Sequence, residues 1–172
     1  MSESFSQRFV AYLQSLAEKQ ERGALAALRR GLGQPPGQAP EMYPYVIPYL
    51  PAGLHPEGEA ACYLLASLFA FHPESAAKGN MGDHMAAAAR QSPNSEAIER
   101  RFTVLLNAHP DDLPAYLRQT VSFLKAKGVP VNWEQLLRDL LYWAHPDYGP
   151  QIRKRWANAF WGRPQETAES ES

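Results

Sequence analysis

Apolar residues recur along most of the chain at intervals of three or four positions. Near the N-terminus, Phe5, Phe9, Leu13 and Leu16 share one face of a helix. The same spacing predicts further helices at about 23–32 and 95–108, after Asp112, after Asn132, and at about 150–161. No segment alternates between apolar and polar residues for long enough to indicate a strand. The pattern therefore predicts an all-α fold, a compact bundle of about seven to nine helices.

One segment is apolar nearly all round. Residues 57–71 contain few polar positions, which is typical of a buried central helix. Cys62 within it is expected to be a small core residue. Prolines interrupt the preceding stretch, 42–51, so only short turns are expected there. A loop is predicted at 72–83, followed by a short alanine-rich helix at about 84–90.

Length and composition favour one domain. The chain has 172 residues, of which 45% are hydrophobic and 20% charged, close to ordinary globular usage. We expect a single all-α domain at 1–164, with two helical sub-bundles at about 1–92 and 93–164 as the alternative. Residues 165–172 carry three glutamates and no basic residue, so an acidic disordered tail is expected there.

The chain lacks the features of membrane and secreted proteins. No apolar run reaches the roughly 18 residues that a membrane span requires, and the first residues lack the basic segment of a signal peptide. The single cysteine excludes a scaffold held together by disulfides. A cytoplasmic protein is expected.

Catalytic and metal-binding motifs are absent from the sequence. There is no H-E-x-x-H, C-x-x-C, phosphate-binding loop or nucleophile elbow. Four of the five histidines precede a proline, a placement that favours capping and turn packing over metal binding. His84, beside Asp83, has no further ligands near it, and Asp111-Asp112 is best explained by the start of a helix. We therefore expect no enzyme activity, no metal and no cofactor.

The formal net charge of −1 hides a local basic surplus. Residues 97–163 contain ten basic and six acidic residues, and 151–163 contain no acid at all. Such a surplus on a nearly neutral protein is typical of a patch that meets phosphates in one place. A solvated helix face would explain the charges equally well.

Helical geometry separates the arginines into two kinds. Arg22 and Arg29 lie seven residues apart, close to an apolar face, so they are expected to be half-buried ties to a neighbouring helix. Arg30 points further round the helix, away from this face, and is therefore expected to be less constrained by a neighbouring helix. Arg118 and Lys125, also seven apart, flank the apolar face of their own helix. Bases on several helices can form a strip that follows phosphates.

Five segments together resemble the CasB family, the small subunit of the type I-E CRISPR surveillance complex known as Cascade. They are residues 22–30, 100–106, 113–124, 131–143 and 152–160, and their order and spacing carry the resemblance.

The resemblance implies a non-catalytic, all-α protein that sits in the complex as a head-to-tail pair. Its expected partners are the backbone and large subunits, guide RNA and target DNA. When guide RNA opens a DNA duplex, the heteroduplex formed is about as stable as the duplex lost. Contacts to the strand backbones can therefore favour the open state without recognising the bases. The basic residues that match by position are Arg22, Arg29, Arg30, Arg100, Arg101, Arg118, Arg138, Arg153 and Arg155. Three lysines join these candidates only because of their charge and the direction in which their side chains are expected to point: Lys125, Lys127 and Lys154. Arg30, Arg100, Arg118, Arg138 and Arg153 are the preferred direct contacts.

Two other interpretations stay open. One is a purely structural assembly subunit whose bases contact acidic proteins and no nucleic acid. The other is a small helical enzyme with a site assembled from scattered histidines and aspartates, for which the sequence offers no candidate spacing.

Overall fold

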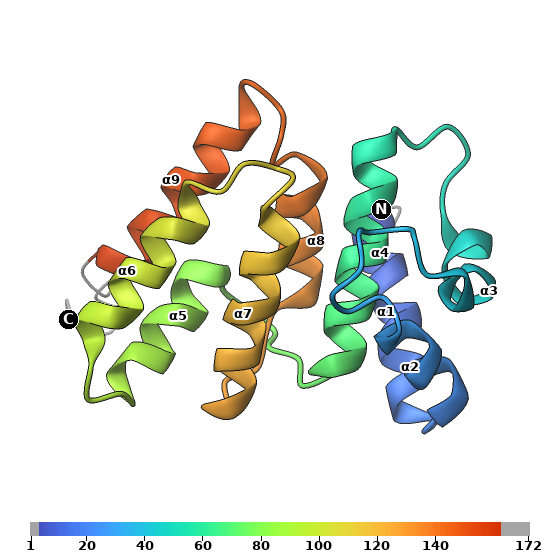
Figure 1. Cartoon of the computed structure of the whole chain (residues 1–172), viewed down its shortest axis with the longest axis horizontal. Coiled ribbons are helices and arrows are strands. Elements are labelled where there is room, and N and C mark those ends of the chain that lie inside the picture. The colour runs from blue at the N-terminus through green and yellow to red at the C-terminus, as the bar shows by residue number, and fades with distance from the viewer. Residues whose placement is uncertain (1–3, 163–172) are drawn as a thin grey trace, which may run out of the picture.

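The computed structural model describes residues 4–162, and within them the fold is all-α, as predicted (Figure 1). This part of the chain contains no strand, only an isolated parallel bridge between Ser75 and Val131. Its nine α-helices are α1 (Phe5–Glu18), α2 (Arg22–Arg29), α3 (Tyr43–Val46), α4 (Pro56–Phe71), α5 (Met81–Arg90), α6 (Ser95–Leu106), α7 (Leu113–Ala126), α8 (Trp133–Leu141) and α9 (Tyr148–Trp161). Two 3-10 turns, η1 (Pro40–Met42) and η2 (Ile47–Tyr49), flank α3.

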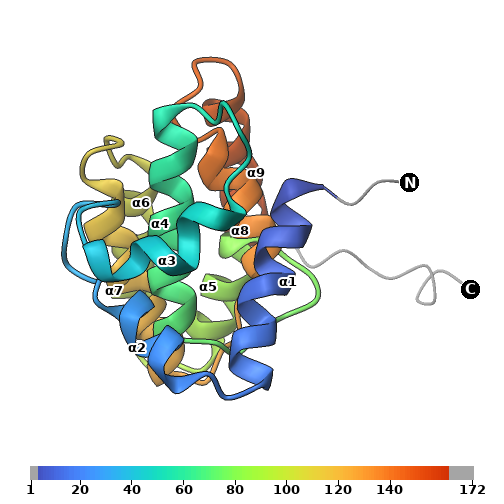
Figure 2. The ribbon, with the colours of Figure 1, turned by 90° about the vertical axis from the view of Figure 1, so that its right-hand side faces the viewer.

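Helix α4 lies at the centre of the arrangement. In Figures 1 and 2, α1, α2 and α3 lie on one side of it, and α5, α6, α7 and α9 lie on the other. The residues that make α4 apolar all round are buried, and Cys62, Leu65 and Phe69 are each 0% exposed. The prediction of a buried central helix with a core cysteine is confirmed. Buried side chains from each of these helices join a single apolar cluster.

Helix α5 begins earlier than the sequence pattern indicated. The predicted loop at 72–83 ends at Asn80, because Asn80 and Asp83 form a capping box. The Asn80 side chain accepts from the backbone N–H of Asp83, and the Asp83 carboxylate accepts from the N–H of Asn80. Asn132 caps α8 as expected, whereas the side chain of Asp112 makes no capping hydrogen bond to α7.

The segment that follows α4 is held against the α7–α8 connection. The ring of His72 hydrogen-bonds the carbonyl of Val129 at 2.8 Å, and the backbone N–H of Val131 donates to Glu74 at 3.1 Å. His84 accepts a hydrogen bond at Nε2 from the N–H of Asn132 at 3.0 Å. These contacts fix α4 relative to α7 and α8, which are the walls of the site described next.

Candidate nucleic-acid interface

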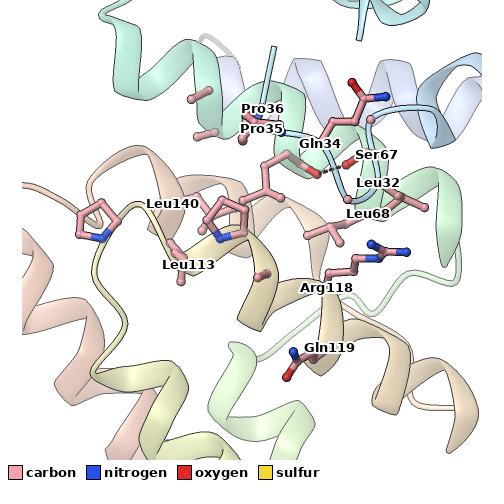
Figure 3. A pocket seen from close by; sticks show the side chains of 18 of the residues that line it. Leu32, Gln34, Pro35, Pro36, Ser67, Leu68, Leu113, Arg118, Gln119 and Leu140 are labelled. Carbon is pink, nitrogen blue, oxygen red and sulfur yellow. Dashed lines mark hydrogen bonds between the residues drawn. The ribbon is translucent and has the colours of Figure 1, made fainter. Parts of the chain in front are cut away.

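A cleft of about 1200 Å³ opens between α4 and α7 (Figure 3). The 31–36 loop forms part of one wall, and the end of α8 contributes to the floor. Apolar side chains dominate the walls, among them Leu64, Leu68, Leu113 and Leu140. The cleft is larger than the roughly 300–1,000 Å³ usual for small-molecule sites.

Arg118 stands on the rim of this cleft. Its guanidinium lies against the 31–36 loop, with Nη1 2.6 Å from where a Cβ on Gly33 would be. Gly33 has φ +81°, a conformation that glycine adopts readily and other residues rarely do. Among residues 4–162 Arg118 makes no hydrogen bond and no ion pair, so its charge is available to a ligand. Figure 3 shows the side chain beside Leu32 and Leu68, at one end of the cleft.

A second, smaller groove of about 430 Å³ continues the cleft between α6 and α7. The two share Arg101, Gln119 and Phe123 in their linings. The guanidinium of Arg101 and the ammonium of Lys127 each lie 5.9 Å from the centre of the Phe123 ring, within cation–π range. Arg100 lines the smaller groove as well, which extends the basic surface onto α6.

The C-terminal end of α4 gathers two more bases. Arg29 donates from Nη1 to the carbonyl of Ala70 at 3.2 Å, and Lys125 donates from Nζ to the carbonyl of Phe71 at 2.9 Å. Lys125 also lies 4.2 Å above the Phe71 ring. The last carbonyls of a helix carry partial negative charge, which favours cations there.

These contacts bring seven of the twelve candidate bases to the cleft and its surroundings. We call this set the basic rim: Arg29, Arg30, Arg100, Arg101, Arg118, Lys125 and Lys127. Arg30 belongs to it because it caps α2 at the start of the loop that contacts Arg118. Segments 22–40 and 113–133, which carry five of the seven, contain no acidic residue. The local positive charge is therefore little compensated.

The other five candidates lie elsewhere. Arg138 on α8 pairs with Glu134 and hydrogen-bonds Ser4. Arg153 lies 4.7 Å above the ring of Trp143, a residue of the cleft lining, but is itself half-buried and not part of that lining. The remaining three, Arg22, Lys154 and Arg155, are exposed at the start of α2 and along α9.

The expected burial of two arginines is wrong. Arg22 and Arg29 are both exposed, because α2 is short and its polar side faces solvent. Arg29 does tie α2 to a neighbouring helix through a carbonyl, as predicted, whereas Arg22 makes no such hydrogen bond within the described residues.

The titratable groups considered next have structural roles within residues 4–162. No three of the histidines, cysteines and carboxylates there converge as a metal site. Burial lowers the pKa of His84, and the nearby Asp83 partly opposes this. Burial raises the pKa of the Cys62 thiol to about 12, so it is no nucleophile at neutral pH. His109 and His145 accept backbone N–H groups at Nδ1, which confirms their expected role in turns.

Comparison with known proteins agrees with this structure. The model of the family "CRISPR-associated protein Cse2" matches residues 24–161. The chain belongs to the CRISPR-associated Cse2 family. A Cse2 protein from Thermus thermophilus is 34% identical over 164 residues, covering 91% of this chain and 89% of the relative.

Solved structures give the same assignment. CasB from Thermus thermophilus superposes with a TM-score of 0.81 at 31% identity, covering 95% of this chain and 100% of that one. A chain of a structure described as a CRISPR RNA-guided surveillance complex gives a TM-score of 0.78 at 26% identity, covering 91% of each. The predicted resemblance to CasB is confirmed.

The Cse2 family match sets limits on the candidate residues. It includes every member of the basic rim but not Arg22, which precedes it. The expected acidic tail at 165–172 lies outside the match and outside the described residues. No helix among residues 4–162 is long and apolar enough to cross a membrane.

Sequence reasoning missed the features that make the site. The helical pattern predicts the direction in which each basic side chain points, but it does not show which of these side chains share a surface. Nothing in the sequence pattern shows that Gly33 adjoins Arg118 or that Phe123 lies between two basic side chains. The absence of acids in 113–133 could have favoured α7 over α8, but it does not separate α7 from α9, because 151–163 contain no acid either.

Proposed function

We propose that this Cse2 protein is a non-catalytic subunit of a CRISPR RNA-guided surveillance complex that binds nucleic acid through the basic rim, without sequence preference. Its role in antiviral defence is to stabilise the R-loop in which guide RNA pairs with target DNA. The family assignment and the similarity to a chain of a surveillance complex support membership of the complex. The observation that carries nucleic-acid binding is the pair Arg101 and Arg118, which make no ion pair within residues 4–162 and line a cleft with further bases near it.

The chemistry of the rim suits phosphates rather than base edges. Lysines and arginines that neutralise phosphates release counterions, which gives affinity for any sequence. R-loop formation is nearly balanced between the duplex lost and the heteroduplex gained, so a few such contacts to an opened strand decide whether it stays open. A near-zero net charge agrees with weak binding by the isolated subunit and stronger binding in the assembly.

The partners of this role are other Cascade subunits, guide RNA and target DNA, with a second copy of the chain as neighbour and a cytoplasmic location. One observation favours protein contacts as well. Ile47 and Tyr49, in the proline-rich η2 turn, are 52% and 46% exposed, so two large side chains lie close together on the surface there. If the protein is a purely structural subunit, this surface would bind the protein partner and the basic rim would bind no nucleic acid.

A salt titration with paired variants tests the proposal. Arg101→Ala with Arg118→Ala should weaken binding of a single strand and flatten the log–log salt slope by about one unit for each phosphate that is no longer neutralised. The matched control, Arg138→Ala with Lys154→Ala, removes the same charge away from the cleft and should leave the slope unchanged. Absence of binding at low salt would support the assembly-only alternative, whereas salt-independent affinity or equal weakening in the two double variants would contradict binding through the basic rim.

A further inference from the structure

The cleft has a shape and lining that phosphate binding does not require. A phosphate needs cations on an accessible surface, and it gains nothing from apolar walls. Here apolar side chains of α4 and α7 line a half-open cleft whose lining also includes the two arginines. Leu113 and Leu140 lie toward the end of the cleft away from Arg118 (Figure 3). A ligand that fills it must be apolar over much of its surface.

The cleft also offers a few unused polar groups. Gln119 is exposed on α7, and its side chain makes no hydrogen bond within the described residues. Ser67 donates to the carbonyl of Leu64 at 2.9 Å, so its oxygen can still accept. Gln34 donates to the carbonyl of Arg30 at 3.2 Å, which leaves its own carbonyl oxygen available. The amides of Gln34 and Gln119 lie at the margins of the cleft and point outward (Figure 3), so they can meet the polar edge of a flat ligand only where it reaches the opening.

Charge distinguishes the two ends of the cleft. Arg101 and Arg118 supply positive charge at one part of the lining. Glu57 lies in the first turn of α4, and Asp111 lies just before α7, so both acids lie toward the N-terminal ends of the walls. An anionic group is therefore favoured beside the arginines and disfavoured beside the acids. The matching ligand has one anionic end and a flat, largely apolar body with a polar edge.

A nucleotide unit of an unpaired strand has these properties, and we propose that the cleft receives one or more unstacked nucleobases while Arg101 and Arg118 hold the adjoining phosphates. This inference rests on the proposed function and adds a selection for single strands, because bases in a duplex cannot enter. A strand held in this way would have to leave the cleft before it re-forms the duplex. The cleft volume of about 1200 Å³ leaves room for more than one base.

Two probes of equal charge separate base binding from phosphate binding. One is an oligothymidylate strand, and the other is a strand of the same length whose sugar–phosphate units carry no bases. With the full-length protein at low salt, the oligothymidylate should bind about tenfold more tightly by fluorescence anisotropy, since stacking and burial of bases add to the shared phosphate contacts.

Variants locate the effect in the cleft. Ala60→Leu with Ala115→Leu narrows the cleft from α4 and from α7 without touching a base of the rim. This pair should lower affinity for the oligothymidylate to that of the base-free strand and leave the base-free strand unchanged. The control pair, Ala11→Leu with Ala26→Leu, adds the same volume at exposed positions of α1 and α2 outside the cleft. Thermal melts of both pairs confirm that they fold.

Each outcome is decisive. Equal affinity of the wild-type protein for the two probes overturns the inference, while the proposed function survives if that binding falls with salt and needs Arg101 and Arg118. A base preference that the cleft-narrowing pair leaves intact also overturns the inference, because the bases then bind elsewhere. Absence of binding to both probes at low salt removes the proposed function and the inference with it.

Discussion

Arg29 and Lys125 donate hydrogen bonds to the carbonyls of two successive residues, Ala70 and Phe71, at the end of α4. Because Arg29 comes from α2 and Lys125 from α7, the end of α4 connects two helices that are far apart in the sequence. The negative end of the helix dipole balances two cations that would otherwise repel each other. Part of the basic rim therefore has a structural reason to be basic.

This relationship predicts a modest loss of stability on removal of either charge. Arg29→Met and Lys125→Met retain most of the aliphatic stem and remove the hydrogen bond, so each should lower the free energy of unfolding by about 0.5–1.5 kcal/mol. Urea denaturation measures the change. The control is Arg22→Met, also exposed on α2 and without a hydrogen-bond partner in the described residues, for which a change within about 0.5 kcal/mol is expected. Equal destabilisation in all three variants would contradict the structural role.

The sequence supplied the helices because each carries its own periodic pattern. Apolar stripes, the Asn132 cap and the all-apolar α4 are local features, and local features can be recognised without the fold. The start of α5 was missed because the Asn80–Asp83 capping box lies among glycine and proline residues that indicate a loop. The sequence pattern does not separate Arg118 from Arg138, since both are basic residues on predicted helices and both are preferred as direct contacts. Only tertiary structure places Gly33 beside Arg118 and Ser4 beside Arg138.

Gly33 sets the position of Arg118, and this gives a second prediction. In Gly33→Ala the new methyl group would lie 2.6 Å from Nη1 of Arg118, and φ +81° would add backbone strain. Arg118 must move, so single-strand affinity should fall toward that of Arg118→Ala. Anisotropy titrations of the two single variants and the double variant measure the coupling. We expect the double variant to bind no more weakly than Arg118→Ala, whereas additive effects would show that Gly33 acts independently of Arg118.

Asp139 and Trp156 form a buried polar contact between α8 and α9. The indole N–H of Trp156 donates to Asp139 at 2.7 Å, and Gln135 donates to the other carboxylate oxygen at 3.0 Å. Both Asp139 and Trp156 are nearly or fully buried. Asp139→Ala should lower the free energy of unfolding by about 1–3 kcal/mol, because it leaves a buried N–H unpaired.

A double-mutant cycle with Trp156→Phe tests that reason, since the phenyl ring has no N–H to leave unpaired. Asp139→Ala should therefore cost less in the Trp156→Phe background than in the wild type. The same cost in both backgrounds would assign the effect of Asp139 to something other than this hydrogen bond. Nucleic-acid affinity should be unchanged in the folded variants, because both residues lie away from the basic rim.

His84 predicts how stability depends on pH. The side chain is 6% exposed, and its Nε2 accepts the Asn132 N–H, so the ring must be neutral at that nitrogen in the folded protein. Desolvation lowers its pKa below the ordinary 6.5, with a smaller opposing effect from Asp83. Below pH 6.5 the unfolded chain therefore binds a proton that the folded chain resists. This contribution to stability is complete above that value and is lost as pH falls toward the lowered pKa, at up to about 1.4 kcal/mol per pH unit.

A neutral replacement isolates this contribution from that of other groups. Burial raises the pKa of Asp139, which acts in the opposite direction by disfavouring the folded state as pH rises. Both proteins share that carboxyl group, so it cancels when the wild type is compared with His84→Gln, whose side-chain oxygen can still accept from Asn132. Urea unfolding from about pH 7.5 to about pH 5 should show the wild type losing stability faster than the variant as the solution becomes more acidic. Parallel curves would mean that His84 binds its proton as readily in the folded protein as in the unfolded chain, and the neutral ring inferred from the Asn132 contact would then be wrong.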